Sequence, residues 1–174
     1  MEQLNQNILQ FYDYHVWATR KLIEHLKEVP QDIYEAEFQS VFSSFSQALS
    51  HIYRADNVWL AGISGESFDN IRAKAFQWEE ELKGLSLEEI RTKFEELFDR
   101  YRSSLHQRMD GDTKIEFKHP SYGSLKTNIF EIVQNVVNHG TYHRGNITDM
   151  LRQKGHPGTP TDYIVYLYTL NRSE

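Results

Sequence analysis

The sequence contains no cysteine. This absence excludes a disulfide framework, a thiolate zinc site and a cysteine nucleophile. Any metal ion must therefore be held by histidine and carboxylate side chains. Long hydrophobic runs are missing too, since no stretch approaches the roughly 18 apolar residues that span a bilayer, and the start M-E-Q-L-N-Q-N lacks the basic and apolar parts of a signal peptide. We expect a soluble, cytoplasmic protein without a membrane partner.

Basic residues are fewer than acidic residues in this sequence. The chain has 19 Lys+Arg against 25 Asp+Glu, so its net charge is −6. A negative net charge opposes binding to a phosphate backbone, and nucleic acid is therefore not an expected partner. A length of 174 residues fits one domain spanning 1–174, which is large enough to bury a core without covalent links. Aromatic residues, at 13%, suit a thick helical core.

Apolar residues recur every three or four positions in four long stretches, a spacing typical of amphipathic helices. These stretches are 4–29, 44–62, 87–109 and 127–154. Pro30 disfavours helix in the residue before it and ends the first stretch. Ser86 and Glu89 form a capping box at the start of the third, and Thr127 is expected to cap the fourth. The pattern predicts an all-α four-helix bundle with long connections.

The segments between the long helices give weaker signals. Residues 63–85 have weak periodicity and predict a long connection that could form a rim over a pocket. The run T-K-I-E-F-K-H (113–119) alternates polar and apolar residues, which predicts a short extended excursion, in the form of a small hairpin, before the fourth helix. The run D-Y-I-V-Y-L-Y-T-L (162–170) predicts a short C-terminal helix that could close one end of the bundle.

The run H-G-T-Y-H-R-G (139–145) carries two histidines inside the fourth apolar stretch. Residues four apart on a helix point the same way, so a metal ion could bridge His139 and His143, and Gly140 leaves room beside them. The same spacing also fits two histidines that hydrogen-bond to backbone or water. His51, in the second helix, lies between two alanines where a ligand has space, although a half-buried histidine is equally consistent with this position.

The bundle hypothesis connects the three histidines. If the second and fourth helices are neighbours, His51 can meet His139 and His143 in the core, where helical bundles build metal sites. Three imidazoles leave at least one coordination position open, which is typical of a reactive metal and not of a structural one. Imidazole accepts several metals, of which zinc and nickel are the ones we expect. His15 falls on the inward stripe of the first helix and is a possible neighbour of this site.

Three motifs carry a resemblance to a known family. They are Y-H-V-W-A-T-R-K-L-I-E-H-L (14–26), L-S-H-I-Y-R-A-D-N-V-W-L (49–60) and V-N-H-G-T-Y-H-R-G-N-I-T-D-M-L-R-Q-K-G-H-P (137–157). Together they make the chain similar to the DinB/YfiT family of metal-binding four-helix bundles. The resemblance implies that His51, His139 and His143 are the metal ligands. It also implies a homodimer and a role in stress response.

The resemblance further implies a reaction. Family members are similar to transferases that use a low-molecular-weight thiol, so we expect a metal-activated thiol to attack an electrophilic small-molecule substrate, as in S-transfer. Arg144 could bind a carboxylate of the cofactor or substrate, or could lie on the helix surface. No catalytic residue is assigned.

Two other functions fit the same residues. One is a hydrolase that uses metal-bound water, which wants a nearby carboxylate base. Asp56 and Asp149 are the obvious candidates, but each lies well round its helix from the histidines. The other is a metal-binding bundle without catalysis.

Overall fold

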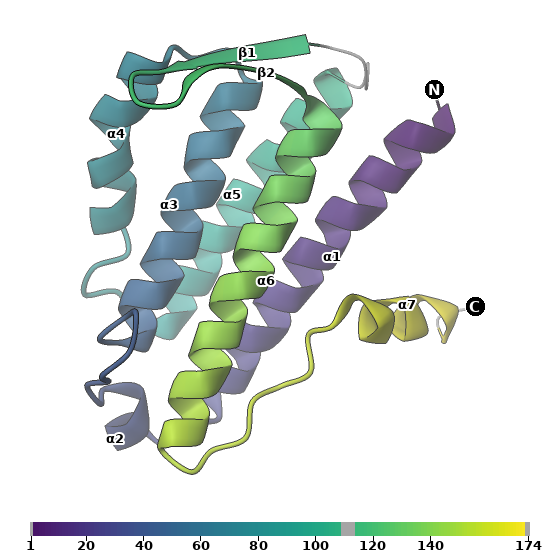
Figure 1. Cartoon of the computed structure of the whole chain (residues 1–174). Coiled ribbons are helices and arrows are strands. Elements are labelled where there is room, and N and C mark those ends of the chain that lie inside the picture. The colour runs from purple at the N-terminus through teal and green to yellow at the C-terminus, as the bar shows by residue number, and fades with distance from the viewer. Residues whose placement is uncertain (1, 109–113, 173–174) are drawn as a thin grey trace.

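A computed structural model describes residues 2–108 and 114–172 of the chain, apart from the side chains of 2–4 (Figure 1). The described residues form seven helices and one two-stranded sheet. Four of the helices are long and run side by side: α1 (Glu2–Lys27), α3 (Phe45–Ile63), α5 (Leu87–Gln107) and α6 (Ile129–Gln153). This arrangement confirms the predicted all-α four-helix bundle.

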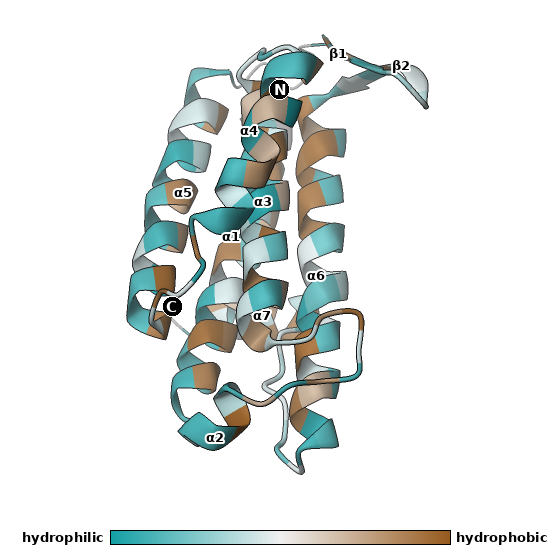
Figure 2. Cartoon of the chain, turned by 90° about the vertical axis from the view of Figure 1, so that its left-hand side faces the viewer, coloured by the Kyte–Doolittle hydropathy of each residue, from teal (hydrophilic) through white to brown (hydrophobic). Residues whose placement is uncertain are grey.

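The core lies between the apolar stripes of the four long helices. Both α1 and α3 pack against α5 and α6, so that α3 and α6 are neighbours. On α5 and α6 the hydrophilic residues face outward and the hydrophobic residues face the other helices (Figure 2). The inward positions recur every three or four residues, as helix geometry requires. The core includes Leu22, Leu26, Phe45, Leu49, Ile52, Phe94, Phe98, Val133, Val136 and Ile147.

Side-chain caps fix where the long helices begin. Ser86 and Glu89 form the predicted capping box at the start of α5. At the start of α6 the expected cap, Thr127, is wrong by one residue: the Asn128 side chain accepts from the backbone N–H of Glu131, while the Thr127 hydroxyl donates to the Glu131 carboxylate at 2.7 Å. Thr127 still belongs to a strand, so the helix begins one residue later than the hydroxyl suggested.

The connections hold more helix than the sequence indicated. Within 63–85 lies helix α4 (Phe68–Glu80), whose N-cap is Ser67; the Ser67 side chain accepts a hydrogen bond from the backbone N–H of Asn70. Ile71 is buried whereas most of α4 is exposed, which explains why its apolar pattern is weak. A single helical turn, α2 (Gln31–Tyr34), also lies between α1 and α3.

The predicted hairpin precedes α6. Strands β1 (Lys114–His119) and β2 (Gly123–Asn128) pair antiparallel, and Gly123, the first residue of β2 after the turn, takes a positive φ of 79°. Phe117 of β1 packs edge-on against Trp59, and a methyl group at Gly62 would come within 2.5 Å of the Phe117 ring. The hairpin therefore covers the C-terminal end of α3. The expected end of the third helix at Met109 lies outside the described residues.

The short C-terminal helix exists, but its position differs from the expected one. Helix α7 (Tyr163–Asn171) lies against the middle of α1 and does not close an end of the bundle (Figure 1). The reason is aromatic packing, since Tyr166 has its ring centroid 5.8 Å from Tyr14 and 5.5 Å from Trp17. Among the residues that the structure describes, no helix has both the length and the apolar composition of a membrane-spanning helix.

Candidate metal centre

The three predicted ligands come together between α3 and α6. His51 comes from the first half of α3, and His139 and His143 lie one turn apart on α6. One nitrogen of each imidazole lies within 4.8 Å of a nitrogen of the other two. Nε2 of His51 lies 3.2 Å from Nε2 of His139. The spacing on α6 and the pairing of α3 with α6 are together responsible for this convergence.

The donor atoms fit a shared metal ion. Two nitrogens bound to one ion at about 2.1 Å, with tetrahedral or octahedral angles, are about 2.9 to 3.4 Å apart. The 3.2 Å between the Nε2 atoms of His51 and His139 falls in this range. Nδ1 of His143 lies 3.1 Å from Oδ1 of Asn146, which can accept a hydrogen bond from the Nδ1–H group. In this tautomer the lone pair of Nε2 is free to bind a metal ion. The triad could therefore hold a metal ion.

Protonation does not compete with this role near neutral pH. Burial, assisted by the neighbouring His143 and Arg54, lowers the pKa of His51 from 6.5 to about 4. Burial and the adjacent histidines lower the pKa of His139 to about 3. Burial also lowers the pKa of His143, against the opposing effect of its hydrogen bond to Asn146. Neutral imidazoles present the lone pairs that metal ions bind.

Aromatic side chains form one wall of the site. The Phe42 ring, from the segment before α3, lies 5.2 Å from both the His51 and His143 rings. Tyr142 lies edge-on to His143 with a centroid separation of 5.0 Å, and it is largely exposed. Sequence reasoning did not identify Phe42, because the segment that carries it has no periodicity linking it to either helix.

A charged side chain forms another edge of the site. Nη2 of Arg54 lies 3.3 Å from Nδ1 of His51, and its Nε lies 3.5 Å from Oε2 of Glu79 on α4. Sequence reasoning missed Arg54 also, although it stands one turn after His51 and so was within reach of it.

Arg144, the residue proposed from sequence to bind a cofactor, points into the core and is only 1% exposed. Its Nη2 donates to the Thr141 hydroxyl at 2.9 Å, and its Nη1 lies 3.4 Å from Nδ1 of His15. His15 in turn pairs through Nε2 with Oδ2 of Asp56 at 2.8 Å, and neither side chain reaches solvent. This burial argues against direct contact between Arg144 and a cofactor. It makes Arg144 part of an internal polar cluster with His15 and Asp56.

Gly140 makes room for this cluster. A methyl group at Gly140 would come within 2.5 Å of Cε1 of His15 and 2.8 Å of Nη1 of Arg144. The sequence analysis expected Gly140 to leave room for a metal ion beside His139 and His143, and the structure differs. In the structure, the groups that occupy the space are an imidazole and a guanidinium.

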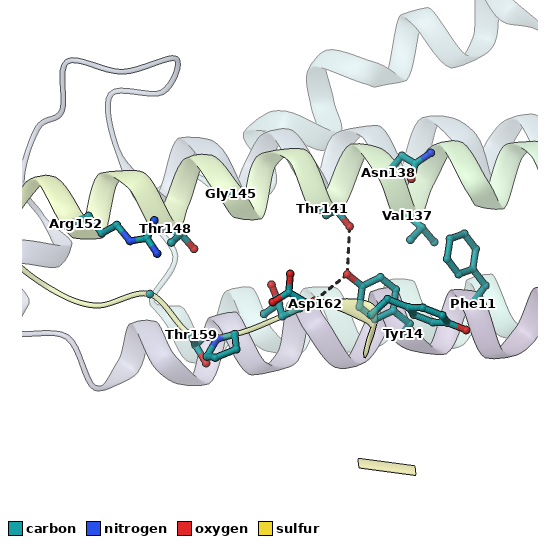
Figure 3. A pocket seen from close by; sticks show the side chains of 14 residues that line it. Phe11, Tyr14, Val137, Asn138, Thr141, Gly145, Thr148, Arg152, Thr159 and Asp162 are labelled. Atoms are coloured by element: carbon teal, nitrogen blue, oxygen red, sulfur yellow. Dashed lines mark hydrogen bonds between the residues drawn. The ribbon is translucent and has the colours of Figure 1, made fainter. Parts of the chain in front are cut away.

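A separate cavity of about 670 Å³ lies on the opposite side of α6, between α1 and the segment 158–163 (Figure 3). Tyr14, Thr141, Thr148 and Asp162 are among the side chains that line it. The Tyr14 hydroxyl donates to the backbone oxygen of Thr161 at 2.8 Å and ties this segment to α1. The three histidines are not among its lining residues, so this cavity is distinct from the candidate metal centre.

Fold and site together define a class: helical-bundle proteins with a histidine triad, set between two neighbouring helices, that could hold a metal ion. Comparison with known sequences gives the family. The sequence model of the DinB family matches residues 1–173, and the chain belongs to this family. It is 43% identical to "Protein DinB" of Bacillus subtilis (strain 168) over 159 residues, which are 91% of this chain and 92% of that protein.

Proposed function

We propose that this DinB-family protein uses a divalent metal ion, zinc or nickel, held by His51, His139 and His143 to activate a low-molecular-weight thiol for transfer to an electrophilic small molecule. The observation that carries this proposal is the convergence of three neutral imidazoles from two helices. Three protein ligands are the number found in catalytic sites, whereas structural zinc sites have four.

A divalent ion with an open coordination position deprotonates a coordinating thiol at neutral pH and so supplies a nucleophile. The chain's own residues prepare the site for this. Asn146 holds His143 with its Nε2 lone pair free, and burial keeps His51 and His139 neutral. Phe42 offers an apolar wall that keeps water from one side of the imidazoles and suits the apolar part of an electrophile.

The placement of the two carboxylates that the sequence suggested as bases favours thiol transfer over hydrolysis. A hydrolase of this type wants a carboxylate base beside the metal-bound water. The carboxylate of Asp56 is hydrogen-bonded to His15 in the core. Asp149 is exposed and accepts a hydrogen bond from Gln153 at 2.9 Å. Neither side chain faces the triad. Thiol activation needs no such base, because coordination would lower the pKa of the thiol enough for it to release its proton to solvent at neutral pH.

Elemental analysis of untagged protein, followed by calorimetric titration with a thiol, tests the proposal. We expect one zinc or nickel ion per chain, and thiol binding that requires the metal. His51→Ala and His143→Ala should each lose stoichiometric metal while keeping the helical circular-dichroism signal. His106→Ala is the matched control, since this exposed histidine on α5 contacts only its own helix backbone in the described structure, at Arg102.

Each alternative result has a clear meaning. Metal retained by both triad variants would reject the ligand assignment. Ester or amide hydrolysis without thiol binding would replace the proposed activity by a hydrolase. Stoichiometric metal with neither activity would identify a metal-binding bundle without catalysis.

A further inference from the structure

Arg54 stands at the edge of the triad in a position that solvent can reach. Its side chain is 34% exposed and that of Glu79, its ion-pair partner on α4, is 35% exposed. The pair is separated by 3.5 Å, and exposed pairs of this kind contribute little to stability. An incoming anion can therefore compete with Glu79 for the guanidinium at low cost.

The contact between Arg54 and His51 depends on which imidazole nitrogen carries the proton. At 3.3 Å from Nδ1, the guanidinium can donate only if Nδ1 is the bare nitrogen and Nε2 carries the proton. A histidine that binds metal through Nε2 carries its remaining proton on Nδ1. Arginine has donors and no acceptor, so in that state two N–H groups would face each other.

If Nε2 of His51 held a metal ion, Nδ1 would carry the proton and would no longer be an acceptor for Arg54. The N–H at Nδ1 and the guanidinium then both require an acceptor on the same side of the site. A carboxylate has two oxygens and can accept from both groups, and hydrogen bonds between charged partners are about twice as strong as neutral ones. The protein's own nearby carboxylate, Glu79, makes only a long contact to Arg54.

From these contacts we infer that Arg54 is the residue that recognises a carboxylate on the ligand of the metal centre. The substrate class is then a small anionic thiol, bound through sulfur at the open metal position and through its carboxylate at Arg54. The thiol part of this inference rests on the proposed function, whereas the carboxylate part rests on Arg54 alone. Arg54 takes the role that the sequence suggested for Arg144, which lies in the core.

Calorimetry with a matched pair of thiols tests the inference on zinc-loaded protein. N-acetylcysteine carries a carboxylate and N-acetylcysteine amide does not. We expect Arg54→Gln to reduce affinity for N-acetylcysteine about tenfold, which is about 1.4 kcal/mol, while affinity for the amide and zinc stoichiometry stay unchanged. Arg54→Lys should restore part of the difference, because it keeps the charge and loses the forked geometry.

Two further variants sharpen the result. Arg72→Gln makes the same change of charge at an exposed position of α4 and should affect neither thiol. Glu79→Gln removes the competing carboxylate and should tighten binding of N-acetylcysteine alone. Unchanged binding in Arg54→Gln, or equal loss for both thiols, would overturn the inference.

A pair of ligands without sulfur separates this inference from the proposed function. Imidazole-4-acetate and 4-methylimidazole both offer a metal-binding nitrogen, and only the first has a carboxylate. If wild-type protein binds neither thiol, the thiol function fails. A preference for imidazole-4-acetate that disappears in Arg54→Gln would still support carboxylate recognition, and its absence from the wild type would refute it.

Discussion

Substitution of Gly140 by alanine should destabilise the protein, against the usual rule for helices. Alanine is favoured over glycine in a helix interior by about 1 kcal/mol. At Gly140, however, the added methyl group would lie 2.5 Å from Cε1 of His15 and 2.8 Å from Nη1 of Arg144. Neither side chain can withdraw easily, because both are buried and His15 is bonded to Asp56.

The size of the effect follows from these opposing contributions. Forcing an extra methyl group into a packed core costs about 1 to 3 kcal/mol, and contacts below 3 Å with three atoms of His15 and Arg144 place Gly140 at the upper end. After the gain in helix propensity, a net loss of about 1 to 2 kcal/mol remains. For a chain of this length, that loss lowers the melting temperature by about 2 to 8 °C.

Gly145 is the matched control for Gly140. It lies on the same helix, and an added methyl group there would meet nothing within 4 Å. Gly145→Ala should therefore stabilise the protein by about 0.5 to 1 kcal/mol. Urea unfolding followed by circular dichroism measures both variants. If the two substitutions change the free energy of unfolding in the same direction, the packing described around His15 and Arg144 is wrong.

Three further predictions concern the core, the triad and a helix cap. Asp56→Ala removes the partner of His15 and should cost about 3 to 5 kcal/mol in urea unfolding, whereas the exposed Asp149→Ala should change stability by less than about 0.5 kcal/mol; similar losses in both would contradict the buried pairing. In metal-free folded protein the pKa values of His51 and His139 are about 4 and about 3, whereas an unfolded histidine has a pKa of about 6.5. Between about pH 6.5 and about pH 4 the unfolded state therefore binds more protons than the folded state. The free energy of unfolding should thus fall as the pH is lowered from about 6.5 to about 4, and less steeply in His139→Gln; an equal slope in both proteins would show that His139 is not buried in the neutral form. Ser86→Ala should destabilise by about 1 kcal/mol through loss of the α5 cap, and no change in the unfolding midpoint would argue against the capping box.

The long helices could be predicted because their signals are local. Apolar spacing and caps such as Ser86 act within one or two turns, so they are visible in the sequence. Helix α4 was missed because it lies on the surface and has a weak apolar face, although its cap at Ser67 is an ordinary serine cap. An apolar stripe in the sequence indicates a helix face that is buried, and a mostly exposed helix has little buried surface to produce such a stripe.

The histidines illustrate the same boundary within the site. The spacing of His139 and His143 requires only that they share a helix face. That His51 meets them depends on α3 and α6 being neighbours, which no local pattern contains. The resemblance to the DinB family implied that the three histidines bind one metal ion, and the match to the family's sequence model shows that the chain belongs to this family.

The class of fold, the approximate extent of the long helices and the imidazoles that share a helix face could all be read from the amino-acid sequence. They follow from helical periodicity and from hydrogen bonds between residues close in the chain. The packing of the helices settles which arginine lies beside the triad. Arg144 and Arg54 each lie close in sequence to a triad histidine, yet the first is turned toward His15 and the core while the second lies beside His51 near solvent. A position close to a histidine along a helix does not show whether an arginine side chain points to the core or to the metal site, because the neighbouring helices define where the core and the site lie.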